Sequence, residues 1–368
     1  MRLQLSAGSV ALALSLVSSA LADAPGDEPS AAASLRVYAD DDHVTVVSPS
    51  AAVQVATSPR TSLAIDTTVD AVSAASVDVV TSASPRPVSE QRVELGIATT
   101  YRTVAGLTWL TVGARGSHEH DYDALRARVS LRRELARRNT TLQVDYVFGA
   151  DRAGSVSDPA FHEGRLGHEL ELTASQLLGV RTIADVIIDT TVADGYHASP
   201  YRDVLVEQMD WPVPLRMAEQ TPRRRASVAL AGRLRHAIAD AWYATATYRY
   251  YRDDWAIASH TGTAELRHQL GARWLVGASV RGYTQDGASF YRAHYADASG
   301  VPALRTRDRT LGPMRSAHAA VTADVTLDEA GSWRLVGSLG ALRWWFLDFP
   351  AQADRNALIV HASVTTSW

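Results

Sequence analysis

Histidines and carboxylates lie close together in two stretches of the chain, and such side chains can bind transition metals. One stretch is His118-Glu119-His120-Asp121, and the other joins His162-Glu163 to His168-Glu169. Imidazole nitrogens and carboxylate oxygens are common ligands of zinc and related metals. Neither stretch has a defined ligand spacing, and both fall where polar loops are expected. The favoured interpretation is therefore no metal site and no cofactor, with His118, His120, His162 and His168 as the metal candidates.

Hydrolytic chemistry would need a nucleophile beside a histidine that a third group holds in place. His197 lies close to Ser199, and His260 follows Ser259. Because neighbouring residues on a strand point to opposite faces, adjacency in sequence does not make a catalytic pair. No catalytic residue is predicted, and a hydrolase is the last of three functional interpretations.

Arginine recurs at every second position in several segments, which gives each segment a charged face and an apolar face. In 92–102, for example, Arg92 and Glu94 alternate with Val93, Leu95 and Ile97. This period of two predicts strands. A soluble sandwich also alternates, but a membrane barrel better explains the arginines, because they would face a wet lumen while apolar residues face lipid. The predicted lumen-lining residues are Arg92, Glu94, Arg126, Arg128, Arg132, Asp145, Arg225, Arg233, Arg235, Arg249, Arg273 and Arg281.

Two interpretations of the arginines remain open. Rings of arginine favour anions in a pore. Alternatively, each arginine pairs with Asp or Glu and braces the wall, since unpaired like charges repel. Both can hold together.

Two further segments can shape the mouth of such a barrel. Residues 72–85 are rich in Ser and Ala, and we expect an inward-packed loop carrying Asp70, Ser73, Ser76 and Asp78, with a surface loop as the alternative. Residues 248–255 mix Tyr, Arg and Asp. They favour an interfacial aromatic girdle over a ligand-binding lip built on Arg249 and Arg252.

The final segment, Ala357 to Trp368, alternates almost without error and ends on an aromatic residue. Such a strand is typical of the last strand of an outer-membrane β-barrel, whose terminal aromatic is read by the assembly machinery. At the other end, Arg2, the apolar run Leu3–Val17 and the small residues Ala20-Leu21-Ala22 predict a signal peptide. We therefore expect a signal peptide at 1–22, a periplasmic tail at 23–33 and a barrel at 34–368.

Connection lengths predict the topology. Long connections near 149–164, 194–222 and 286–313 alternate with short ones near 136–139, 179–180 and 271–272. Long outer loops and short inner turns are the rule in outer-membrane barrels. The full alternation gives an all-β, transmembrane antiparallel β-barrel of about 16 strands, or 14 if the first short hairpin is merged.

Composition narrows the class of protein. No stretch beyond the N-terminal run is apolar for the ~18 residues that a helical span needs. Cysteine is absent, so no disulfide framework is available. The net charge of −4 argues against a nucleic-acid partner. The expected partners are outer-membrane lipid and lipopolysaccharide, the barrel-assembly machinery through Trp368, and a small solute.

Four local strings, taken together, resemble the DUF3570 family of bacterial exported proteins. They are 69–84, Ser199-Pro200-Tyr201-Arg202, 248–255, and Tyr283-Thr284-Gln285 with Phe290-Tyr291. The resemblance covers most of the chain after the signal peptide. It implies an outer-membrane barrel, carries no catalytic residues, and implies a link to redox or flavin proteins of the envelope.

The favoured function is a porin-like conduit for a small polar solute, with an anion preference following from the arginines. The first alternative is a non-conducting barrel that anchors or scaffolds an envelope complex related to redox or flavin chemistry. The second is a barrel hydrolase.

Overall fold

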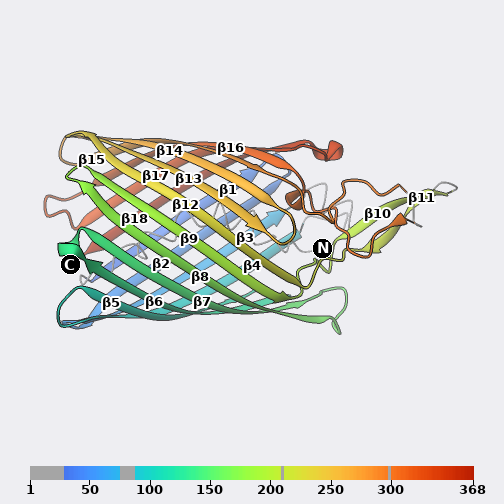
Figure 1. Ribbon diagram of the computed structural model, residues 1–368, viewed down its shortest axis with the longest axis horizontal. Coiled ribbons are helices and arrows are strands. Elements are labelled where there is room, and N and C mark those ends of the chain that lie inside the picture. The colour runs from blue at the N-terminus through green and yellow to red at the C-terminus, as the bar shows by residue number, and fades with distance from the viewer. Residues whose placement is uncertain (1–28, 75–87, 209–210, 297–299) are drawn as a thin grey trace.

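A closed antiparallel β-barrel makes up nearly all of the computed structural model, which describes residues 29–74, 88–208, 211–296 and 300–368. Sixteen of the strands among these residues form the barrel, and it closes where β1 pairs with β18 (Figure 1). The remaining two, β10 (Asp203–Gln208) and β11 (Trp211–Ala218), form a separate hairpin. The predicted fold and strand number are therefore confirmed.

The barrel strands run from 11 to 18 residues. A tilted strand needs only ~9–11 residues to cross the apolar layer of a membrane, so these strands extend past it. Their bounds are β1 (Ser30–Asp40), β2 (Val44–Ser58), β3 (Thr61–Ala74), β4 (Val88–Arg102), β5 (Thr108–His118), β6 (Tyr122–Leu135), β7 (Thr140–Gly154), β8 (His162–Gly179), β9 (Thr182–Gly195), β12 (Arg224–Ala239), β13 (Trp242–Asp253), β14 (Ala258–Leu270), β15 (Trp274–Gln285), β16 (Met314–Thr326), β17 (Trp333–Phe346) and β18 (Asp354–Ser367).

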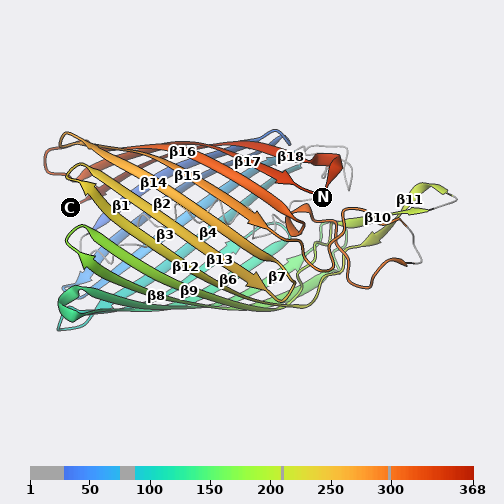
Figure 2. The same cartoon turned by 45° about the horizontal axis from the view of Figure 1, so that its top comes forward.

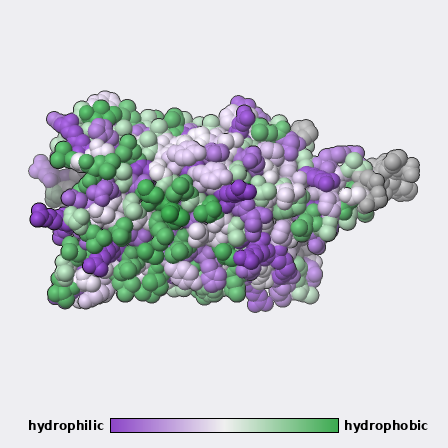
Figure 3. Space-filling view, viewed as in Figure 1, coloured by the Kyte–Doolittle hydropathy of each residue, from purple (hydrophilic) through white to green (hydrophobic). Residues whose placement is uncertain are grey.

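The outer face of the barrel is apolar, as the period of two predicts. Leu95, Ile97 and Val280 are 59%, 50% and 59% exposed, a degree that suits lipid contact rather than water. Hydrophobic residues cover much of the barrel wall in Figure 3, and hydrophilic residues gather more toward its two ends. No helix among the described residues is long and apolar enough to cross a membrane.

The two ends of the barrel differ. One end, the turn end, carries short turns such as 59–60, 180–181 and 240–241, and the C-terminal Trp368. The other, the loop end, carries the long connections 155–161, 196–223 and 286–313. The hairpin β10–β11 belongs to 196–223 and projects beyond the loop end (Figure 2). The long connections thus lie on one side, as the sequence predicts.

One boundary differs from expectation. β1 begins at Ser30, so residues 30–33 belong to the barrel wall and not to an N-terminal tail. The alanines at these positions pair with β2 and β18 and thereby continue the ladder. The predicted signal peptide and the rest of the tail lie outside the described residues.

Candidate functional site: the lumen wall and the mouth

Several arginines on the inner face of the barrel are paired with carboxylates on the neighbouring strand. Arg128 on β6 donates to Asp145 on β7, and Arg235 on β12 donates to both oxygens of Asp185 on β9 at 3.0 Å. In each pair the carboxylate stands two residues away from the position directly opposite the arginine. Such diagonal neighbours are within reach of long side chains. The pairs therefore tie adjacent strands together on the lumen side.

A glycine makes room for one of these pairs. Arg126 lies directly opposite Gly149, and its guanidinium donates to Asp151. A Cβ atom at Gly149 would lie 2.9 Å from Nη1 of Arg126. The missing side chain therefore allows the guanidinium to lie flat against β7. Arg165 on β8 donates to the same carboxylate, so Asp151 joins three strands.

Another cluster joins β3, β4 and β5 on the inner wall. Arg92 donates to Glu94 at 2.5 Å, and Arg115 donates to the other oxygen of the same carboxylate. Arg115 also lies 2.8 Å from Asp66. Arginine and carboxylate charges therefore alternate across these strands.

Some of the predicted lumen arginines have a carboxylate partner and others do not. Arg225 pairs with Asp253 at 2.7 Å and Arg249 with Asp189 at 3.4 Å, while Arg132 reaches Glu134 at 3.5 Å. Within the described residues, Arg233 and Arg281 form no ion pair. Arg281 instead stacks over Tyr283, with its guanidinium carbon 5.4 Å from the ring centroid.

Arg273 is not on the wall. It lies in the turn before β15, where its guanidinium approaches Glu329 of the next turn at 3.8 Å. The β14 strand ends at Leu270, so the alternation that the sequence predicts from position 273 begins only at Trp274. Arg273 is therefore a rim residue at the turn end.

Two cavities adjoin the inner wall. The larger, of about 690 Å³, lies against β13–β18 and includes Thr247, Thr263, Arg281 and His318 in its lining. The smaller, of about 240 Å³, lies against β6–β9, β12 and β13, where Arg126, Arg165, Arg225 and Glu169 line it. The lumen wall therefore offers a sparsely charged face and a densely charged one.

The loop 286–313 packs into the mouth of the barrel. Phe290 and Tyr291 cluster with Trp255 and Ile257 from the turn between β13 and β14. Ala293 packs against a second cluster, formed by β16–β18 and the connection between β17 and β18. Its buried members are Met314, Leu342, Trp344, Phe346, Phe349 and Ala357. The sequence pattern predicts 72–85 as the inward loop and does not indicate 286–313. The length of 286–313 and its three aromatic residues are the features that could have indicated it.

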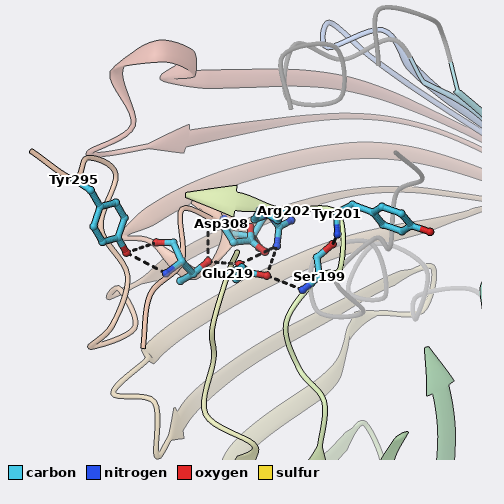
Figure 4. A network of polar contacts seen from close by, with 8 residues as sticks. Ser199, Tyr201, Arg202, Glu219, Tyr295 and Asp308 are labelled. Atoms are coloured by element: carbon cyan, nitrogen blue, oxygen red, sulfur yellow. Dashed lines mark hydrogen bonds and ion pairs between the residues drawn. The ribbon is translucent and has the colours of Figure 1, made fainter. Parts of the chain in front are cut away.

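A buried polar network joins this loop to the other long connection, 196–223 (Figure 4). Arg202 lies 2.8 Å from Asp308 and 3.3 Å from Glu219. Glu219 also accepts from the backbone N–H of Ser199 at 2.7 Å and from the hydroxyl of Thr306. Since Arg202 and Glu219 come from one loop and Thr306 and Asp308 from the other, the network holds the two loops together at the mouth.

Residues 196–202 reach across the mouth to the connections before β6 and β8. The hydroxyl of Tyr201 donates to Asp121 and accepts from the backbone N–H of Val156 at 2.8 Å. Burial raises the pKa of Tyr201 to about 12, so it remains a donor. Burial, with help from Arg165, lowers the pKa of His197 to about 4, so its ring is neutral where it packs edge-on against Trp255.

The segment 248–255 contributes side chains to both the outer and the inner face of the barrel. Tyr248 is 54% exposed on the outer wall and bonds His260 at 2.6 Å, as a girdle residue would. Asp253 is buried and orders the next turn, because it accepts from the backbone N–H groups of Trp255 and Ile257 at 3.1 and 2.9 Å. Arg249 points inward and Arg252 is exposed, so the two do not form one lip.

The residues predicted for an inward loop are only partly described. Asp70 lies on β3 with its side chain buried, and Oδ2 lies 4.0 Å from Nε of Arg92. Ser73 is on β3 as well, but its side chain is not described. Ser76 and Asp78 lie outside the described residues.

The histidine metal candidates do not come together. His118 is exposed and pairs with Asp123 at 2.6 Å, and His120 is exposed too. His168 bonds Tyr146 at 2.8 Å, while His162 begins the same strand, β8. The two serine–histidine neighbours form no catalytic pair either: His197 bonds the carbonyl of Ala193, and His260 bonds Tyr248.

The closed sheet, its apolar outer face and its charged inner face define a β-barrel of the kind found in outer-membrane proteins. The model of the family described as "Protein of unknown function (DUF3570)" matches residues 149–336. The chain belongs to the DUF3570 family.

Solved structures support the fold. The chain is similar to a bacterial polysaccharide outer membrane secretin, with 10% identity over 92% of this chain and 98% of that one and a TM-score of 0.52. It is also similar to CdiB from Acinetobacter baumannii, with 9% identity, 93% of this chain and 60% of that one covered, and a TM-score of 0.52. Such low identities establish likeness of fold alone. No curated protein matches the chain.

Proposed function

We propose that the chain is a conduit in the bacterial outer membrane for a small polar solute, with a preference for anions. In this proposal lipid and lipopolysaccharide contact the apolar outer face. Trp368, which is 66% exposed at the turn end, is the residue that the barrel-assembly machinery reads.

The observation that carries the anion preference is Arg281. Its guanidinium lines the 690 Å³ cavity and has no carboxylate partner among the described residues, so its charge is available to a solute. Arg233 on β12 supplies a second inner-face guanidinium of this kind. Positive groups along a pore lower the electrostatic cost of an anion that sheds water. The paired arginines brace the wall. In this proposal anion selectivity and bracing, the two interpretations that the sequence left open, therefore belong to different arginines of one barrel.

Conductance across a planar bilayer tests this function. Purified protein should give stepwise currents, and in a salt gradient the reversal potential should lie on the anion-selective side. A barrel that inserts, as judged by its resistance to added protease, but carries no current would contradict the proposal.

A specific observation favours one second candidate, a non-conducting scaffold. The two long loops are joined at the mouth, and the hairpin β10–β11 projects beyond it with Val213 and Leu215 61% and 40% exposed. An exposed apolar hairpin is typical of a surface that binds another protein. Silent but stably inserted barrels would favour this function, and the envelope complex would then be the partner.

A further inference from the structure

Three carboxylates meet at the loop end of the barrel, close to the lumen wall. They are Glu90 at the start of β4, and Glu119 and Asp121 between β5 and β6. One oxygen from each lies within 4.8 Å of an oxygen from each of the others. Glu119 and Asp121 belong to the string that suggested a histidine metal site, but the structure gathers its acidic residues and leaves its histidines in solvent.

Among the described residues, the positive charge near Glu119 and Asp121 is shared with other carboxylates. Arg92 approaches Glu119 at 4.0 Å, but it also lies 2.5 Å from Glu94 and 4.0 Å from Asp70. Of the other basic groups, Arg36 interacts with Asp70, and His118, which interacts with Glu119, is paired to Asp123. Among the described residues, the positive charge nearest Glu119 and Asp121 is thus shared with other carboxylates, and like charges held close together repel one another.

Asp121 provides an independent observation. The residue is 8% exposed, and its Oδ2 accepts the hydroxyl of Tyr201. Its other oxygen, Oδ1, is buried and accepts no hydrogen bond from any described residue. Oδ1 of Asp70 is likewise buried and accepts no hydrogen bond from any described residue. A buried carboxylate oxygen without a hydrogen-bond donor is destabilising, so such atoms call for a ligand.

The type and spacing of the carboxylate oxygens in this cluster fit the coordination of calcium. Ca²⁺ binds six to eight oxygens at about 2.3–2.6 Å, so ligands on opposite sides of the ion lie about 5 Å apart. The spacing within 4.8 Å fits that geometry. Magnesium requires a shorter, strict octahedron and keeps most of its water, and zinc prefers nitrogen and sulfur ligands.

We propose that Glu90, Glu119 and Asp121 form a calcium site at the loop end. The ion would neutralise the cluster and link β4 to the connection between β5 and β6. Asp121 also accepts a hydrogen bond from the hydroxyl of Tyr201. The bound ion would therefore fix the point where residues 196–202 dock at the mouth. Calcium would thus stabilise the closed arrangement of the loops whether the barrel conducts or serves as a scaffold.

Calcium titration of the whole barrel in detergent, after treatment with EDTA, tests this site. Isothermal titration calorimetry should give one site per chain, and the temperature of heat unfolding should rise with calcium. E119Q and D121N should each weaken binding by about tenfold or more, since each removes one charged ligand. The control is D123N, which changes a carboxylate two residues from Asp121 that pairs with His118 and lies outside the cluster.

Folding of each variant is checked separately by the mobility shift of unheated barrel on a denaturing gel. The proposal is overturned if the EDTA-treated wild type shows neither heat of binding nor a calcium-dependent rise in unfolding temperature. It is equally overturned if correctly folded E119Q and D121N bind calcium as D123N does, because the ion would then lie elsewhere.

Discussion

Arg309 and Asp42 form a buried ion pair of 2.6 Å between residues 267 positions apart, with side chains 4% and 6% exposed. Arg309 belongs to the loop that leaves β15, and Asp42 to the turn between β1 and β2. The loop therefore spans the inner faces of β16, β17 and β18 and is anchored beyond them. Arg309 also stacks over Phe346, 4.6 Å from the ring centroid, which explains why so buried a guanidinium is tolerated.

R309A should free the loop 286–313 from the wall. Leaving a buried charge unpaired costs about 3–5 kcal/mol, but Arg355 still lies 2.8 Å from Asp42, so the cost of R309A should be smaller than that. We expect faster cleavage of this loop by added protease and larger single-channel currents. The control is R343A on the exposed pair with Asp354, for which about 0–1 kcal/mol is expected. Equal protease sensitivity of the two variants would refute the anchoring role.

R281A and R128A should both make the lumen less anion-selective, but they should differ in their effect on stability. Arg281 is unpaired among the described residues, so its loss should leave stability nearly unchanged and reduce anion preference. Arg128 neutralises Asp145, which is 7% exposed, so its loss should lower stability and shift preference toward cations. Reversal potentials and heat unfolding of both variants measure this difference. An unchanged preference in R281A would remove Arg281 from the path.

Acid should loosen the mouth through His197. Its pKa is lowered from an ordinary 6.5 to about 4 in the folded chain, so the unfolded chain binds a proton more readily. The stabilisation is therefore complete above pH 6.5 and is lost as the pH falls toward 4. Wild-type unfolding temperature should decrease across this window more than that of H197N. Parallel curves for the two proteins would show that His197 does not contribute.

G149A should weaken the wall beside Arg126. The new methyl group would lie 2.9 Å from the guanidinium and push it from Asp151, at a cost of about 1–3 kcal/mol. The matched control is G232A, because a Cβ at Gly232 meets nothing within 4 Å. Urea unfolding followed by gel mobility compares the two. A loss of stability in G232A as large as in G149A would point to backbone effects instead.

The wall of the barrel could be predicted from the sequence because its pattern is local. Arg126, Arg128 and Leu125 reveal their faces by a spacing of two, which depends only on strand geometry. Which carboxylate each arginine meets could not be predicted, since a pair such as Arg235 and Asp185 depends on the register between strands.

The mouth was harder to predict than the wall. Contacts such as Tyr201 with Asp121 depend on the path of irregular loops, for which no repeating pattern exists. The acidic cluster could be predicted in part. Glu119 and Asp121 are two residues apart and could have been assigned to one side, but Glu90 comes from another strand.

The seam between β1 and β18 has a consequence for biogenesis. Ser30 pairs with Ser367 and Asp40 with Ala357. One edge of β1 therefore cannot pair until β18 has been synthesised. Until then both carry rows of unsatisfied amide and carbonyl groups, which invite mispairing with other chains. Ring closure across more than 300 residues is also intrinsically slow. Shielding of the two free edges until they meet would therefore protect a nascent chain of this design from mispairing.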